Sequence, residues 1–384
     1  MTVADRSLFV SRHVRVRDVM GASGVDALLV THLPNVIYLT GLNSTDGAAI
    51  ILRASLLLVV DFRYVTAARE AVQQLGDDGV QVVPVERSYD EAIVEILRSA
   101  AAARIGVEGA WLSVSRFNTL SARLAAAAPF PIQPDQRSPV LVPTERVVER
   151  ARIVKDDREV LVLREAGRRL SLVARGLPGL VRAGRSEQEI AGEIERAMRD
   201  AGFSRPAFET IVASGPNSAF PHARPTGRRL AAGEPCVLDF GGVYDGYCVD
   251  LTRTVQLGRA ATSMQRLFDA VSEAHDTAIA AVRPGIRPSE IDRAARDVLV
   301  RHGLGQAFGH GTGHGLGLEI HEEPRIGQIV AGRPDEPVEP GMVFTIEPGA
   351  YVPGLGGVRI EDDVLVTPGG CELLTDVPIW MEIL

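Results

Sequence analysis

Four carboxylates and one histidine in the C-terminal half of the chain are of the types that hold divalent cations in hydrolases. They are Asp239, Asp250, His314, Glu347 and Glu361. If these side chains meet, the four acids cannot all stay ionised without cations, because like charges raise each other's pKa. A pair of divalent metal ions is the simplest neutralising partner. We therefore expect the five side chains to converge on one dinuclear site.

The first two carboxylates, Asp239 and Asp250, stand on either side of a turn. Apolar residues flank positions 243–246, and an Asp-Gly pair is typical of a tight hairpin. The midpoint of the two aspartates lies between Tyr244 and Asp245. A hairpin centred there would make the two aspartates direct cross-strand neighbours, with Cβ atoms about 4.5–5.5 Å apart.

Glu347 and Glu361 repeat this arrangement, because they are symmetric about Gly354 in a bend rich in Pro and Gly. Two hairpins that each present a carboxylate pair indicate a duplicated half-fold. His314 lies in a glycine-rich stretch, residues 309–317, where the glycines indicate close backbone approach. Any one of these acids alone would be interpreted as a solvated turn or edge residue, so the prediction rests on their conjunction.

The elements that position these residues fall into two regions. The first, residues 1–145, alternates apolar strands with helical stretches, which predicts an α/β domain with a mixed sheet. Strands are expected at 27–31, 48–52, 56–60, 81–85 and 105–108, and helices at 64–75, 88–103 and 113–127. A stretch rich in Pro and charge, residues 133–149, indicates the boundary.

The second region, residues 146–384, predicts an α+β domain in which helices cover one face of an antiparallel sheet. Helices are expected at 156–181, 186–201, 262–282 and 289–302, with the carboxylate hairpins between and after them. Ser186 is expected to open a capping box with Glu189.

Composition excludes several classes of function. The net charge of −8 leaves no basic footprint, so we expect no nucleic-acid partner. Three cysteines without CxxC spacing indicate neither a disulfide framework nor a zinc ribbon. We find no signal peptide and no apolar stretch that could span a bilayer. A cytoplasmic protein without a membrane partner is the expectation.

The five residues and their surroundings resemble the metallopeptidases that include aminopeptidase P, prolidase, methionine aminopeptidase and creatinase. In chain order the five fall in Leu-Asp-Phe-Gly, Asp-Leu-Thr-Arg-Thr, Gly-His-Gly-Leu-Gly, Thr-Ile-Glu-Pro-Gly and Arg-Ile-Glu-Asp. Residues 38–42 and 61–64 resemble the creatinase/prolidase N-terminal domain. The resemblance covers essentially the whole chain. It implies a creatinase-like α/β domain before a pita-bread catalytic domain, and two divalent ions per subunit, Mn, Co or Zn, of which we expect Mn.

The resemblance also assigns roles to single residues. Cations bridged by carboxylates lower the pKa of a shared water, which then attacks a peptide carbonyl. Glu347 would bind a metal and take the proton from that water. His321 would steady the tetrahedral intermediate, and His222 would contact the substrate. Creatinase keeps this fold without the ligands, so the fold alone does not decide the function.

Four further residues are expected at the edge of the site. His310 is a candidate for the pocket wall, although a histidine in an apolar segment is more often packed in the core. Arg359 resembles an arginine that supports the ligands, with an ordinary salt bridge as the alternative. Thr252 is expected to contact a ligand. Arg325 stands where some prolidases are thought to hold the carboxylate of a dipeptide.

The substrate class follows mostly from the resemblance. Proline has no amide N–H, so a site that holds the free amine near the metals and the ring in a slot suits an Xaa-Pro bond. We favour an Xaa-Pro aminopeptidase acting on peptides, with an Xaa-Pro dipeptidase (prolidase) as the alternative. A hydrolase of small non-peptide C–N bonds and a catalytically silent binding module stay open as other classes. Family members commonly pair through their N-terminal domains, so a homodimer is expected.

Overall fold

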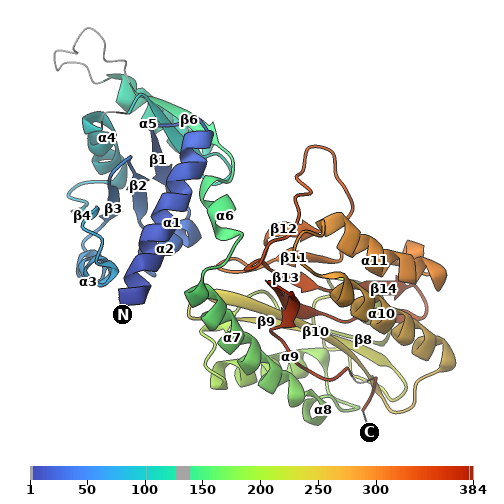
Figure 1. Cartoon of the computed structure of the whole chain (residues 1–384). Coiled ribbons are helices and arrows are strands. Elements are labelled where there is room, and N and C mark those ends of the chain that lie inside the picture. Colours follow the sequence, from blue (N-terminus) through green and yellow to red (C-terminus); the bar gives the residue numbers. More distant parts are fainter. Residues whose placement is uncertain (1–2, 101, 127–138, 380, 384) are drawn as a thin grey trace. The chain divides into compact units, whose positions relative to one another are not determined.

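The computed structural model describes residues 3–100, 102–126, 139–379 and 381–383 (Figure 1). The chain separates into two compact units, one ending at Arg152 and the other beginning at Ile153. This separation lies one short helix beyond the expected boundary between residues 145 and 146. Within the described ranges, no helix combines the length and the apolarity needed to cross a membrane.

The first unit is built on a six-stranded sheet with mixed parallel and antiparallel pairs. In spatial order its strands are β4 (Val80–Pro84), β3 (Leu56–Val60), β2 (Ala48–Ile51), β1 (Ala27–Val30), β5 (Arg104–Glu108) and β6 (Val140–Thr144). Its helices are α1 (Val3–Ala22), α2 (Leu33–Thr40), α3 (Val65–Leu75), α4 (Tyr89–Ser99), α5 (Val114–Ala126) and α6 (Val147–Arg152). The predicted mixed α/β domain is confirmed.

Sequence patterns did not predict α1 and α2. The stretch 133–149, interpreted as the domain boundary, contains β6 and the start of α6, and its residues 133–138 lie outside the described residues. Helix α1 escapes prediction because its buried face carries Arg12 and His13. Arg12 donates to the Tyr38 carbonyl at 3.0 Å, and a ring nitrogen of His13 lies 2.7 Å from the Leu39 carbonyl. Polar groups on the inward face interrupt the apolar periodicity that marks an amphipathic helix. Helix α4 also ends earlier than expected, at Ser99.

The second unit contains two five-stranded sheets and a two-stranded ribbon, so the single antiparallel sheet that we expected is divided. The first sheet comprises β7 (Arg205–Pro206), β8 (Ile211–Ser214), β9 (Pro235–Tyr244), β10 (Tyr247–Leu257) and β18 (Glu382–Ile383). The second comprises β11 (Gly313–Gly315), β12 (Glu322–Ile326), β13 (Val343–Ile346), β16 (Asp362–Thr367) and β17 (Gly370–Leu373). The ribbon is β14 (Gly349–Val352) with β15 (Gly356–Arg359). Pro348, which has no N–H to donate, separates β13 from the ribbon.

Each sheet of the second unit has its own pair of long helices (Figure 1). Helices α7 (Asp157–Arg175) and α9 (Glu187–Asp200) contact the first sheet, whereas α10 (Thr262–Ala281) and α11 (Pro288–Arg301) form a buried core with the second. The helix expected over 156–181 is interrupted at Gly176, and the short α8 (Leu177–Leu180) follows with Pro178 in its first turn. The expected capping box between Ser186 and Glu189 is confirmed.

The β9/β10 hairpin has a different register from the predicted one. Asp245 and Gly246 occupy the two turn positions with φ of 46° and 86°, which fits a type I′ turn. Asp239 is therefore opposite Thr252, and Asp250 is opposite Gly241. The prediction that the two aspartates pair directly is wrong, because the preferred turn residues move the centre of the hairpin by one position. They remain diagonal neighbours on the same face, where Cα atoms are about 7–8 Å apart.

The second hairpin has the predicted register. Ile346 pairs with Asp362 and Gly349 pairs with Arg359, so the two ladders around Glu347 and Glu361 share their centre at Gly354. A backbone bridge between Thr252 and Glu361 then joins this hairpin to β10. This bridge brings the carboxylates of the two hairpins to one place.

Candidate metal centre

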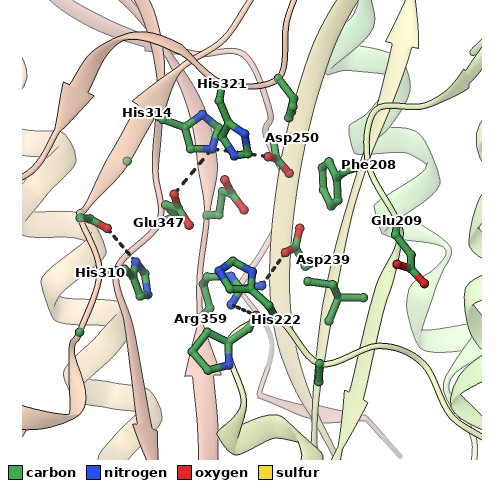
Figure 2. Close-up of a pocket in the computed structure, with 18 of the residues that line it drawn as sticks. Phe208, Glu209, His222, Asp239, Asp250, His310, His314, His321, Glu347 and Arg359 are labelled. Atoms are coloured by element: carbon green, nitrogen blue, oxygen red, sulfur yellow. Dashed lines mark hydrogen bonds and ion pairs between the residues drawn. The ribbon is translucent and has the colours of Figure 1, made fainter.

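The five predicted metal ligands line one pocket in the second unit (Figure 2). Ligand atoms of Asp250, His314 and Glu361 all lie within 4.8 Å of one another. The Nε2 atom of His314 is 3.9 Å from Asp250 Oδ2 and 3.7 Å from Glu347 Oε1. Asp239 is drawn beside Asp250 in the same pocket. Side chains that are far apart in the sequence thus lie close together in the folded chain.

Close packing of β11 explains the glycines around His314. A methyl group at Gly313 would overlap the Thr345 carbonyl of β13, and one at Gly315 would overlap the Glu323 carbonyl of β12. The close backbone approach inferred from the sequence is therefore an approach to neighbouring strands. This close packing fixes the position of His314 between β12 and β13.

Burial and mutual repulsion dominate the electrostatics of the carboxylates. Burial, followed by the charges of the neighbouring acids, raises the pKa of Asp250 and of Glu361 well above the usual range. Burial also raises the pKa of Glu347, although His310 and Arg359 oppose it. Burial lowers the pKa of the His314 imidazole, which favours the neutral form that binds metals.

Two of the buried carboxylates each have one oxygen engaged and the other without a donor among the described residues. Asp239 Oδ2 accepts from Arg359, and Glu361 Oε2 accepts from the Thr252 hydroxyl at 2.6 Å. Asp239 Oδ1 and Glu361 Oε1 are buried and have no hydrogen-bond partner in the described structure. Such oxygens beside a neutral imidazole fit divalent cations, because a cation supplies the missing positive partner.

Arg359 and Thr252, which the sequence predicted beside the ligands, contact Asp239 and Glu361 respectively. The Arg359 side chain is only 4% exposed, and besides Asp239 its guanidinium contacts the Thr252 hydroxyl at 3.2 Å and the Pro221 carbonyl at 3.1 Å. It also donates to the Tyr351 hydroxyl at 2.6 Å. Sequence reasoning missed Tyr351, whose position in the second hairpin was the only available signal.

Four other predicted residues line the pocket: His222, His310, His321 and Arg325. The His321 ring lies edge-on to His314 with ring centroids 4.4 Å apart. His310 is 3.3 Å from the Tyr351 hydroxyl through Nε2. Arg325 stands opposite His314 in the β11/β12 ladder. The pocket has a volume of about 880 Å³, and its wall includes Phe208, Glu209 and Arg224, which the sequence did not single out.

A network on α11 supports the segment that carries the two histidines, and sequence reasoning missed it as well. The buried Asp292 carboxylate accepts from the Thr312 N–H at 3.1 Å and from the Thr312 hydroxyl at 2.9 Å. Arg296 pairs with Asp292 and donates to the His310 carbonyl at 2.9 Å. The Thr312 carbonyl in turn accepts the N–H of Glu347 at 2.7 Å. Asp292 therefore anchors Thr312, which accepts the N–H of Glu347 and lies two residues before His314 in the chain.

Two family sequence models match this chain. Residues 162–368 match the sequence model of metallopeptidase family M24, and residues 12–154 match that of the creatinase/prolidase N-terminal domain. An Xaa-Pro dipeptidase of Pyrococcus horikoshii is 30% identical over 375 residues, which cover 94% of this chain and 95% of that protein.

Solved structures show the same likeness. An Xaa-Pro dipeptidase from Bacillus anthracis superposes with a TM-score of 0.89 at 32% identity, covering 98% of this chain and 100% of the other. An X-Pro aminopeptidase from Thermotoga maritima gives a TM-score of 0.82 at 29% identity, covering 95% of this chain and 100% of the other.

Proposed function

The chain belongs to metallopeptidase family M24, with a creatinase-type N-terminal domain before a pita-bread catalytic domain, and from this premise we propose that it is an Xaa-Pro aminopeptidase. In this proposal it hydrolyses the bond before proline at the N-terminus of peptides. The observation that carries the proposal is the single pocket in which four carboxylates and a neutral imidazole meet.

The family implies divalent metal ions, and five residues of this chain fit them. We propose that Asp239, Asp250, His314, Glu347 and Glu361 hold two ions, with Mn²⁺ preferred over Co²⁺ or Zn²⁺. When bound, such ions polarise the scissile carbonyl and acidify the attacking water. The Arg359 contact to Asp239 and the Thr252 contact to Glu361 hold these carboxylates in place.

The remaining steps belong to side chains of the chain itself. Glu347, whose pKa burial raises, takes the proton from the attacking water and passes it to the leaving nitrogen. His321, whose pKa burial and the neighbouring His314 lower, is neutral and donates its N–H to the oxygen of the tetrahedral intermediate. His222 lies exposed at the pocket wall and contacts the substrate.

The size of the pocket supports action on peptides longer than two residues. Its volume of about 880 Å³ lies near the upper end of the roughly 300–1,000 Å³ typical of small-molecule sites. A second candidate, an Xaa-Pro dipeptidase, is favoured by Arg325, which lines the pocket and can pair with the carboxylate of a dipeptide. A cytoplasmic location and a homodimer complete the proposal.

One experiment tests the function. We would measure turnover of an Xaa-Pro dipeptide and of a matched Xaa-Pro-Xaa tripeptide by the chelated enzyme and by the enzyme restored with Mn²⁺. We expect turnover only after restoration, with the tripeptide preferred, and near abolition in Glu347→Ala and His321→Ala. Turnover of small amides but of neither peptide would indicate a non-peptide C–N hydrolase, and no turnover at all would indicate a binding module.

A matched pair of variants separates the two peptidase candidates. Arg325→Met should leave tripeptide turnover nearly unchanged if the enzyme is an aminopeptidase, whereas a dipeptidase would lose affinity for its substrate. Arg333→Met is the control, because Arg333 shares a small neighbouring hollow with Arg325 and is not part of the main pocket.

A further inference from the structure

A buried carboxylate outside the metal centre gathers an unusual set of donors. Glu187 is the first residue of α9 and is 0% exposed. Its Oε1 accepts from the Ser214 N–H at 2.8 Å, the Ser214 hydroxyl at 2.7 Å and the Asn217 amide at 3.0 Å. Its Oε2 accepts from the Thr226 N–H at 2.9 Å and the Thr226 hydroxyl at 2.6 Å. One side chain thus holds three residues spread over a single loop.

This loop, residues 214–226, carries His222. It starts at the end of β8 and passes through a short 3-10 turn, and His222 itself belongs to no helix or strand. Glu187 binds the loop at both ends, through Ser214 and Thr226. The position of His222 in the pocket, visible in Figure 2, therefore depends on how the backbone of the loop is anchored.

The opposite side of the loop is anchored to the second carboxylate hairpin. The Gly357 N–H donates to the Ser218 hydroxyl at 2.9 Å, and Arg359 donates to the Pro221 carbonyl at 3.1 Å. His222 follows Pro221 directly. The loop is consequently held between the metal-ligand hairpin on one side and Glu187 on the other.

Helix capping does not account for Glu187. The start of α9 is satisfied by Ser186 and Glu189, which exchange the two hydrogen bonds of a capping box. The donors to Glu187 are mostly those of the loop, and their hydrogen bonds outweigh burial and keep its pKa below the usual value. An ionised carboxylate suits this place because the groups bonded to its two oxygens are N–H and O–H donors.

We propose that Glu187 is a positioning residue for the peptidase site: its carboxylate clamps the loop 214–226 and so fixes His222 against the substrate. The proposal rests on the proposed function for its kinetic consequence. The clamp itself is independent of catalysis and can be tested without substrate.

The first test is hydrogen exchange on the metal-loaded, full-length protein. Glu187→Gln keeps the shape of the side chain but places an amide N–H against the N–H and O–H donors of the loop. We therefore expect hydrogen exchange in residues 214–226 to become about ten- to a hundredfold faster. Glu189→Gln is the matched control, because Glu189 lies on the same turn of α9 and caps the helix without touching the loop. Unchanged protection in Glu187→Gln would overturn the proposal.

The second test is a double-mutant cycle with His222. We expect Glu187→Gln to raise KM for the Xaa-Pro tripeptide about tenfold, with kcat within about twofold of the wild type, because a loosened loop weakens ground-state contacts. In a His222→Ala background the same substitution should change KM by less than about twofold. An equal effect in both backgrounds would show that Glu187 acts through overall stability, which overturns the positioning role.

Two provisions keep the test decisive. If Glu187→Gln does not fold, Thr226→Val serves in its place, because at this exposed residue it removes the 2.6 Å hydroxyl contact to Glu187, together with the 3.1 Å contact from the Arg228 N–H, and leaves the Glu187 carboxylate intact. If the wild-type enzyme turns over no Xaa-Pro peptide, the proposed function fails, and the exchange measurement alone then supports or refutes the clamp.

Discussion

The Arg253→Met substitution should expose how strongly the two halves of the catalytic domain depend on one guanidinium. Arg253 is 1% exposed, and its Nη2 lies 2.9 and 3.1 Å from the two carboxylate oxygens of Asp362. It also donates to the Glu361 carbonyl at 2.7 Å and to the Val377 carbonyl at 2.7 Å. Methionine fills a similar space but satisfies none of these acceptors.

The expected loss of stability in Arg253→Met follows from the burial of the Arg253–Asp362 ion pair. Removing one partner of a buried ion pair costs about 3–5 kcal/mol, because the other charge stays desolvated and unpaired. For a unit of this size each kcal/mol lowers Tm by about 2–4 °C, so the expected loss is about 6–20 °C. Arg164→Met is the control, since the Arg164–Glu372 pair is 2.7 Å long but its side chains are 45% and 39% exposed. Such exposed pairs contribute about 0–1 kcal/mol.

The loss of stability in Arg253→Met should depend on pH because His275, which can be protonated, also contacts Asp362. Its Nε2 lies 3.1 Å from Asp362, and although burial lowers the pKa of His275, the contacts to Asp276 and Asp362 raise it overall. A raised pKa stabilises the fold below the unfolded value of about 6.5 and loses that effect as pH rises through the folded value. The positive charge of Arg253 disfavours the protonation of His275. In Arg253→Met this repulsion is absent, so at low pH the protonated His275 balances part of the charge of Asp362.

The assay is urea unfolding of the chelated wild type and variant at pH 6 and pH 9, with calorimetric Mn²⁺ binding on the same samples. We expect the loss in unfolding free energy to be larger at pH 9 than at pH 6. We also expect weaker Mn²⁺ binding, because the backbone of Glu361 loses its anchor. A loss no larger than that of Arg164→Met, or one independent of pH, would refute the reasoning.

Three further predictions concern the metal site. Gly313→Ala should lower Tm and reduce kcat/KM by about a hundredfold, because the added methyl displaces β11. The control is Gly309→Ala, whose methyl meets nothing within 4 Å and which should keep the wild-type Tm. Asp292→Asn should weaken Mn²⁺ binding about 10–100-fold in calorimetry while the protein stays folded by circular dichroism. Asp250→Asn should raise the Tm of the metal-free protein and abolish the rise in Tm on adding Mn²⁺. Burial, and after it the charges of the neighbouring acids, raises the pKa of Asp250. The ionised Asp250 therefore destabilises the metal-free fold increasingly as pH rises above its unfolded pKa, and the gain in Tm should grow with pH.

Local patterns predicted those parts of the fold that local interactions determine. The first five strands of the first unit, β1 to β5, were found to within a residue because they are short, apolar and bounded by turns, whereas β6 was missed. The Gly354 hairpin was found in register because its flanking residues are symmetric. The β9/β10 register was missed because the midpoint of two functional residues carries no turn chemistry, whereas the Asp245-Gly246 pair does.

The candidate site divides in the same way. Motif residues such as Asp239 and His314 could be named from the sequence because their neighbours are distinctive. Glu187 could not, since a carboxylate in the first turn of a helix is ordinarily explained by the helix dipole. Asp292, the fifth residue of α11, could not either, since no local motif marks it. Their partners Ser214 and Thr312 lie 27 and 20 residues away in the chain. Nothing in a local window shows that those donors need an acceptor.

Neither carboxylate hairpin can present its acids alone, and this mutual dependence explains why so much negative charge can be buried. The Thr252 hydroxyl of the first hairpin donates to Glu361 of the second, and Arg253 binds the Glu361 carbonyl. In return Asp363 accepts the N–H of Asp250 at 3.0 Å, and Arg359 holds Asp239. Each half therefore supplies donors to the acids of the other, while Asp239 and Glu361, which both line the pocket, each keep one oxygen without a donor among the described residues. If the proposed metal ions bind these acids in the folded state alone, loading the site and stabilising the interface between the two halves are one linked equilibrium.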